Sequence, residues 1–133
     1  MAPNLSVVVP IFNEAESLPE LIDQLLSALR PTKESFELVL VNDGSTDGSG
    51  MTLLDLSRKI PELVGVQLRK NYGQTAAMAA GFDVAQGDII VSLDGDLQND
   101  PADIPLLVEK LREGFDLVSG WRYERQDAVL QRK

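Results

Sequence analysis

Asp88-Ile-Ile-Val-Ser-Leu-Asp-Gly-Asp-Leu-Gln-Asn-Asp-Pro101 is the stretch on which the expected fold depends. Its apolar run, Ile89 to Leu93, suits a strand that is covered on both faces of a sheet. Gly95 then allows the backbone to turn, and the closing proline suits the first position of a helix. Asp94 and Asp96 therefore follow the carboxyl end of a buried strand, which is where open α/β sheets bind ligands.

Oxygen-bearing side chains recur at every second position after this run. Residues two apart in extended backbone point the same way, so Asp94, Asp96 and Gln98 could share one pocket. Oxygen ligands without sulfur or imidazole suit Mg2+ or Mn2+ rather than Zn2+. An isolated Asp-X-Asp sequence is also typical of an ordinary turn, so the rest of the chain has to decide between a turn and a metal site.

The composition is that of one globular domain. The chain has 133 residues, of which 44% are hydrophobic and 25% are charged, so we expect a buried core rather than disorder. It has no cysteine and no histidine, which excludes disulfides, thiolate nucleophiles, the usual zinc sites and a histidine base. The net charge of -9 argues against a nucleic-acid partner, which would need a basic face.

The sequence shows no signal peptide or membrane segment. No run approaches the roughly 20 apolar residues of a membrane helix, and the first residues lack the basic region of a signal peptide. We therefore expect a soluble, cytoplasmic fragment. The final stretch, Ala128 to Lys133, is amphipathic and has no helix stop signal, so we expect the natural chain to continue beyond it.

Strand and helix patterns alternate along the chain. We expect strands at 5–11, 36–41, 64–68, 89–93 and 116–119, and helices that include 18–29, 53–60, 74–85 and 101–111. Leu53, Leu54 and Ile60 are expected on the inner face of the second helix. This order predicts an α/β fold with an open, mostly parallel sheet, helices on both faces and right-handed crossovers.

Charged side chains follow each of the first four predicted strands. They are Glu14, Asp43, Arg69 or Lys70, and Asp94 with Asp96. Because the carboxyl ends of parallel strands meet at one edge of a sheet, the four loops are expected to converge there. Turn chemistry does not require a charged group in every such loop, so the convergence favours a binding site over a simple turn at Asp94.

Five motifs stand in order along the chain: Val-Val-Val-Pro-Ile-Phe-Asn-Glu (7–14), Val-Asn-Asp-Gly-Ser-Thr-Asp (41–47), Arg-Lys-Asn-Tyr-Gly-Gln (69–74), Asp-Gly-Asp-Leu-Gln (94–98) and Gly-Trp-Arg-Tyr (120–123). Together they resemble family 2 glycosyltransferases of the GT-A fold. Within that family the chain is most similar to polyprenyl-phosphate sugar transferases, which include dolichol-phosphate mannose synthases and bactoprenol-phosphate glucosyltransferases. The resemblance implies that residues 1–133 are the N-terminal part of a Rossmann-like nucleotide-sugar-binding catalytic domain.

The resemblance also implies roles for individual residues. Nucleotide-sugar binding is implied for Pro10, Phe12, Glu14, Val41, Asp43, Arg69, Lys70, Asp94, Gly95 and Asp96. Phe12 matches an aromatic residue that lies against the base, and Asp43 matches a carboxylate that holds the base or ribose. Asn42 stands where many relatives carry an acidic residue, which leaves that part of base recognition open.

The acidic motif and the last motif carry the catalytic roles that the resemblance implies. Asp94, Asp96 and Gln98 match the ligands of a divalent metal, Mg2+ or Mn2+, beside the diphosphate. Arg122 matches a basic residue that meets phosphate, so the implied catalytic set is Asp94, Asp96 and Arg122.

The implied reaction is metal-dependent, inverting transfer of a hexose from a nucleotide-diphosphate sugar to a polyprenyl phosphate. UDP-glucose is favoured as donor, with GDP-mannose second. A lipid phosphate is already an anion near neutral pH and needs no strong base, which fits a chain without histidine. The full-length protein would work at the cytoplasmic face of a membrane, which it would reach through its missing C-terminal part. Homo-oligomerisation stays open.

Two other functions stay open at this point. The chain could be a non-catalytic module that binds a nucleotide sugar or a metal, because relatives complete the acceptor site and the membrane attachment further along. It could also be a phosphoacceptor or phosphatase-like domain with Asp94 as nucleophile, although that class requires a lysine and further acidic residues at the ends of later strands. Rossmann dinucleotide binding is disfavoured, since no Gly-X-Gly-X-X-Gly follows the first strand.

Overall fold

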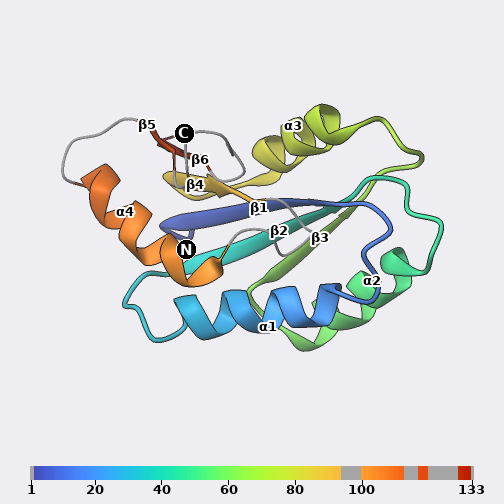
Figure 1. The fold of residues 1–133 in the computed structure, drawn as a ribbon, viewed down its shortest axis with the longest axis horizontal. Coiled ribbons are helices and arrows are strands. Elements are labelled where there is room, and N and C mark those ends of the chain that lie inside the picture. The colour runs from blue at the N-terminus through green and yellow to red at the C-terminus, as the bar shows by residue number, and fades with distance from the viewer. Residues whose placement is uncertain (1, 94–99, 113–116, 120–128, 133) are drawn as a thin grey trace.

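A mixed β-sheet with helices on both faces forms the centre of the molecule (Figure 1). The computed structural model describes residues 2–93, 100–112, 117–119 and 129–132. The elements in chain order are β1 (Leu5–Ile11), α1 (Leu18–Leu29), β2 (Phe36–Asn42), α2 (Ser49–Lys59), β3 (Leu63–Gln67), α3 (Gln74–Val84), β4 (Ile89–Ser92), a 3-10 turn η1 (Pro101–Asp103), α4 (Ile104–Arg112), β5 (Leu117–Ser119) and β6 (Val129–Arg132). The predicted α/β fold is confirmed.

The strands lie in the order β3-β2-β1-β4-β6-β5. The first four run parallel, and β6 runs antiparallel to both β4 and β5. Val129–Arg132 is thus a strand, in an amphipathic stretch where no strand was expected. A four-residue amphipathic pattern is too short to distinguish a strand from a helix, and the open edge of β4 provides backbone partners that a helix there would leave unpaired.

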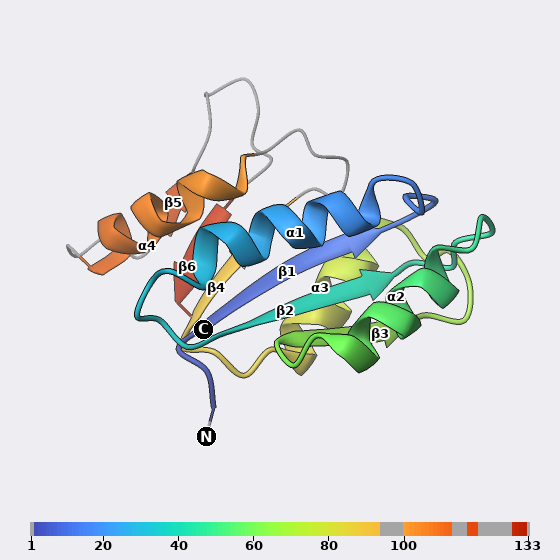
Figure 2. The same cartoon turned by 90° about the horizontal axis from the view of Figure 1, so that it is seen from below.

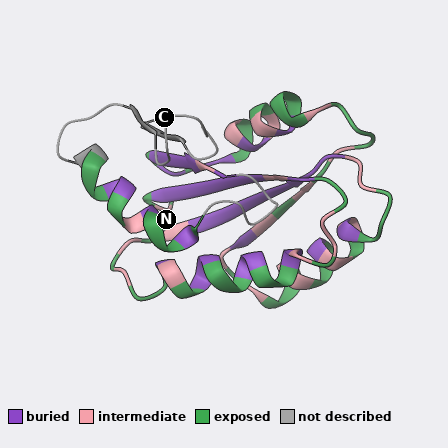
Figure 3. Cartoon of the chain, in the orientation of Figure 1, coloured by how far each residue is buried: buried purple, intermediate pink, exposed green. Residues whose placement is uncertain are grey.

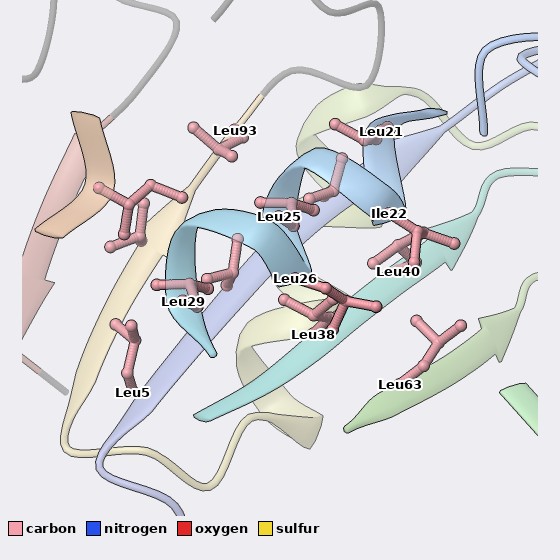
Figure 4. Packing of buried hydrophobic residues seen from close by; sticks show 14 of the residues in the cluster. Leu5, Leu21, Ile22, Leu25, Leu26, Leu29, Leu38, Leu40, Leu63 and Leu93 are labelled. Atoms are coloured by element: carbon pink, nitrogen blue, oxygen red, sulfur yellow. The ribbon is translucent and has the colours of Figure 1, made fainter. Parts of the chain in front are cut away.

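Helices α1, α2 and α4 cover one face of the sheet, and α3 covers the other (Figure 2). The larger core lies under the first group, where leucines of α1 point onto β1 and β2 (Figure 4). In Figure 3 the inner strands are almost entirely buried. In α2, Leu53 is fully buried, but Leu54 is 39% exposed, so its expected inner position was wrong. The helix turns about 100° per residue, which carries Leu54 away from the face that Leu53 occupies.

Small residues allow α3 to lie close to the sheet. Ala77 and Gly81 are buried against Val8 and Val41. A Cβ atom at Gly81 would lie 2.4 Å from Cγ1 of Val8, a distance that no side chain tolerates without movement. Because α3 begins shortly after β3 ends, this close packing fixes its first residue, Gln74, at the carboxyl edge of the sheet.

Candidate functional site

A cavity of about 370 Å³ opens at the carboxyl ends of β1 and β2. This volume lies at the lower end of the range for small-molecule pockets. The lining residues are Pro10, Ile11, Phe12, Glu14, Asp43, Asn71, Gly73 and Gln74. The structure therefore brings together four residues that the sequence analysis selected for nucleotide-sugar binding: Pro10, Phe12, Glu14 and Asp43.

Asp43 connects the end of β2 to β1 and to the loop after β3, at the cavity wall. Its side chain is buried, and its backbone N–H donates to the carbonyl of Ile11 at 2.8 Å. Its carboxylate accepts hydrogen bonds from the backbone N–H groups of Tyr72 at 2.8 Å and Gly73 at 3.0 Å, and from Nδ2 of Asn71 at 3.3 Å. The side chain is thus fixed in place before any ligand binds.

The loops after β2 and β3 touch at Gly44. This glycine has φ 70°, a left-handed conformation that favours glycine. A Cβ atom there would lie 2.3 Å from the backbone N of Asn71 and from the carbonyl carbon of Lys70. Glycine at position 44 therefore permits the close approach that brings the 69–74 motif to Asp43.

The loop after β1 is fastened to the loop after β2 through Asn13. Its backbone N–H donates to Oγ of Ser45 at 2.9 Å, and its Oδ1 accepts from the backbone N–H of Thr46 at 2.8 Å. Asn13 has φ 53°, a conformation that asparagine tolerates better than most residues. These contacts hold the neighbouring Phe12 and Glu14 at the cavity.

A second set of contacts between these loops centres on Asp47. Its Oδ1 accepts from Oγ of Ser49 at 2.6 Å, and its Oδ2 accepts from the backbone N–H of Ala15 at 3.2 Å. The hydrogen bond from the Ser49 hydroxyl is the main cause that lowers the pKa of Asp47 below its ordinary value, with further lowering by backbone N–H groups. Ser49 also accepts from the backbone N–H of Glu14 at 3.0 Å.

Phe12 and Glu14 contribute an aromatic surface and a carboxylate to the cavity. The ring of Phe12 is 44% exposed, which leaves it available to stack on a planar group. Glu14 is half-buried, and its Oε2 accepts from Oγ of Ser17 at 3.1 Å.

Asn42 is not among the residues that line the cavity. Its Nδ2 donates to Oε1 of Gln67 at 2.7 Å, and its Oδ1 accepts from the backbone N–H of Ser45 at 3.1 Å. The residue that departs from the family pattern is therefore engaged in joining β2 to β3 and in closing its own loop.

Three of the selected residues do not line this cavity. Val41 is fully buried in the cluster beneath α3. Arg69 and Lys70 are exposed, and Nζ of Lys70 lies 5.3 Å from the ring centre of Tyr72. Neutral members of the same motif line the cavity instead. Asn71, Gly73 and Gln74 were not predicted from the sequence, because in this motif only the positive charges of Arg69 and Lys70 indicated a contact with phosphate.

The acidic motif and Arg122 fall outside the described residues. These are Asp94, Gly95, Asp96, Gln98 and Arg122. The structure does describe the residue that precedes the acidic motif: Leu93 is buried, and its backbone N–H donates to the carbonyl of Val8 in β1 at 3.0 Å. The chain therefore enters the motif next to β1, at the edge where the cavity opens.

The metal ligands expected from the sequence all lie in this acidic motif. Within the part of the chain that the structure describes, no group of three acidic, histidine or cysteine side chains is arranged to hold a metal ion. The donor types that follow Leu93, two carboxylates and an amide oxygen, fit a hard divalent cation such as Mg2+ or Mn2+.

The chain matches the family model Glycosyl transferase family 2 over residues 6–133. It is 45% identical over 129 residues to an undecaprenyl-phosphate 4-deoxy-4-formamido-L-arabinose transferase of Aeromonas hydrophila, a match that covers 96% of this chain and 40% of that protein. The chain thus spans about two fifths of the length of the curated relatives it matches.

Two solved structures share the fold. The mannosyltransferase PcManGT from Pyrobaculum calidifontis, in complex with GDP-Man and Mn2+, has a TM-score of 0.84 at 22% identity, and the match covers 99% of this chain and 45% of that one. S. aureus TarS 1-349 in complex with UDP has a TM-score of 0.71 at 26% identity, with 88% of this chain and 34% of that one covered. Among the described helices, none is both long and apolar enough to cross a membrane.

Proposed function

The chain belongs to glycosyl transferase family 2, and we propose that the protein transfers a sugar from a nucleotide diphosphate to a polyprenyl phosphate. The observation that carries the proposal is the cavity at the ends of β1 and β2, because three of the five family motifs supply its lining. The relative in Aeromonas hydrophila, at 45% identity, supports a polyprenyl phosphate as acceptor.

The cavity holds the nucleotide part of the donor. Phe12 provides an exposed ring against which the base stacks. The buried carboxylate of Asp43 accepts a hydrogen bond from the base, and its orientation is already fixed by the loop that contains Asn71. The base is thus bound by groups that need little rearrangement, which lowers the cost of ordering on binding.

The diphosphate lies towards the acidic motif. Asp94, Asp96 and Gln98 would hold a divalent cation, which as a Lewis acid neutralises the charge that grows on the departing diphosphate. Arg122 is the residue that we assign to phosphate. The acceptor phosphate attacks as an anion, so the reaction needs no histidine, and in-line attack inverts the anomeric centre.

UDP-glucose is the first candidate donor, as the family resemblance implied. The structure of TarS with UDP, at 26% identity, supports a uridine nucleotide. The activity of the relatives favours a second candidate, in which the sugar is 4-deoxy-4-formamido-L-arabinose.

The test is transfer of labelled sugar to undecaprenyl phosphate by the full-length protein with Mg2+ or Mn2+. UDP-glucose, UDP-linked 4-deoxy-4-formamido-L-arabinose and GDP-mannose are compared. We expect a lipid-linked product from a UDP donor, a large loss in Asp43→Ala, and little change in Asp55→Ala, which alters an exposed carboxylate on α2. Donor binding without transfer would identify a non-catalytic module instead, and a phosphoryl group trapped on Asp94 would identify a phosphotransfer domain.

A further inference from the structure

The carboxylate of Asp43 serves both the fold and the cavity. Asp43 lines the cavity, yet only 3% of the residue is exposed. Oδ1 accepts from the backbone N–H of Tyr72, and Oδ2 accepts from the backbone N–H of Gly73 and from Nδ2 of Asn71. The path of the loop fixes the two backbone donors, whereas the third donor exists only because residue 71 is asparagine.

The side chain of Asn71 is itself held in one orientation. Besides the carboxylate, its Nδ2 donates to the backbone carbonyl of Asp43 at 3.2 Å. Both partners are acceptors, so the amide nitrogen rather than the amide oxygen faces Asp43. The close contact between the backbone of Asn71 and Gly44 leaves this part of the loop little freedom to move.

The number of acceptor positions limits what Asp43 can bind. An ionised carboxylate offers about four acceptor positions. Donors among the described residues fill three of them, so about one remains for a ligand. Uracil presents one N–H donor between two carbonyl groups, whereas guanine presents two adjacent N–H donors. A carboxylate with one open position satisfies uracil and leaves one guanine donor without a partner, which a buried site disfavours.

Building on the function proposed above, we propose that Asn71 is a positioning residue that makes the site selective for uridine over guanosine nucleotides. It does so by occupying the third acceptor position of Asp43. Removal of its amide frees that position, so the carboxylate can then accept both donors of guanine. The same change lets the carboxylate turn, which weakens its hydrogen bond to uracil.

The experiment compares UDP with GDP, because the two ligands differ only in the base. Affinities are measured by calorimetry on the full-length protein at fixed Mg2+. We expect the wild type to bind UDP at least about tenfold more tightly than GDP, and Asn71→Ala to reduce that ratio by about tenfold, mostly through weaker UDP binding. Thr75→Ala, an exposed change at the start of α3, should keep the wild-type ratio.

A purely structural role for Asn71 would weaken both nucleotides together and leave the UDP to GDP ratio unchanged, and that result would overturn the inference. A UDP analogue methylated at N3 gives a second test in the wild type, since it lacks the N–H donor. It should bind at least about tenfold more weakly than UDP, and equal binding would also overturn the inference. If the wild type binds neither nucleotide, the proposed function fails as well.

Discussion

Asp43 is the residue whose replacement should affect both stability and binding. Asp43→Asn keeps the shape of the side chain but replaces one acceptor oxygen with an NH2 group, which would face N–H donors from Asn71, Tyr72 or Gly73. We expect the free energy of unfolding to fall by about 1–3 kcal/mol, the usual effect of an unsatisfied buried polar group. Urea unfolding measures this loss, and UDP titration should show weaker binding. Asp55→Asn, which alters an exposed carboxylate on α2, is the control. Equal stability of the two variants would contradict the role of Asp43.

Asp47 should make the stability of the protein depend on pH. Hydrogen bonds, first from the Ser49 hydroxyl, lower its pKa in the folded state below the ordinary value of 3.8. Because the folded-state pKa is the lower one, the ionised carboxylate stabilises the fold fully at pH values above the ordinary pKa. This stabilisation is lost as the pH falls through the folded-state pKa.

The urea midpoint of the wild type and of Asp47→Asn, measured from about pH 7 to about pH 3, tests this dependence. We expect the difference in midpoint to be largest near neutral pH and to shrink in acid. Ser49→Ala removes the main cause of the lowered pKa, so its difference in urea midpoint from the wild type should also shrink in acid. A difference that stays constant with pH would show that Asp47 acts through its shape and not through its charge.

At the scale of single residues, the sequence identified residues that line the cavity better than residues that position them. Pro10, Phe12, Glu14 and Asp43 were found because each lies in a motif next to a strand end. The contact of Asn71 with Asp43 joins residues 28 positions apart and depends on how β2 and β3 pair. No local pattern carries that information, so the sequence indicated a binding role for the cations Arg69 and Lys70 and none for the neutral Asn71.

At the scale of elements, the close packing of α3 on the sheet should be sensitive to added volume. In Gly81→Ala the new Cβ would lie 2.4 Å from Cγ1 of Val8 and 3.1 Å from Cγ2 of Val41. Overpacking of this kind costs about 1–3 kcal/mol, which outweighs the gain of up to about 1 kcal/mol in helix propensity. We expect a net loss in the free energy of unfolding, measured by urea unfolding.

Two further variants make the Gly81 prediction specific. Ala79→Leu adds more volume on the exposed side of the same helix and should change stability little. Val8→Ala should be less harmful in the Gly81→Ala background than in the wild type, because it removes the atom that clashes. Additive effects of the two changes would mean that α3 shifts away from the sheet instead of meeting Val8.

The sequence predicted the four parallel strands well because the patterns that indicate them are local. Runs such as Leu5–Ile11 are long, β-branched and bounded by loop residues, and the leucines of α1 repeat at helical spacing. Val129–Arg132 was not recognised as a strand, since its identity depends on pairing with β4, which lies about forty residues earlier. The prediction that Leu54 faces inward was wrong for a similar reason, because only the packed orientation of α2 decides which leucine is buried.

At the scale of the whole molecule, the two edges of the sheet differ in character. At the amino edge a buried network closes the fold: Ser6 donates to Glu37 at 2.6 Å, and the backbone N–H of Gln86 donates to the same carboxylate at 2.7 Å. At the carboxyl edge, loops from three strands meet around an open cavity. One edge therefore holds neighbouring strands together through buried hydrogen bonds, whereas the other carries the candidate ligand site.

Because the acidic motif follows β4 at the same edge, nucleotide and metal should stabilise the protein together. At a UDP concentration about 100 times its dissociation constant, binding adds about 2.7 kcal/mol to the free energy of unfolding. We expect UDP-glucose with Mn2+ or Mg2+ to raise the unfolding temperature of the full-length protein clearly more than UDP-glucose with a chelator. GDP-mannose should have a smaller effect under both conditions.

Asp94→Asn and Asp96→Asn assign that metal dependence to the acidic motif. Each variant should lose the metal-dependent part of the thermal shift while keeping the smaller part that UDP produces alone. Phe12 and Asp43, where we propose that the base binds, are unchanged in both variants. Loss of one such electrostatic partner should also slow sugar transfer by about 10²–10³. If both variants keep the full metal-dependent shift, the cation is held elsewhere, and the cavity formed by the loops after β1, β2 and β3 would concern the nucleotide alone.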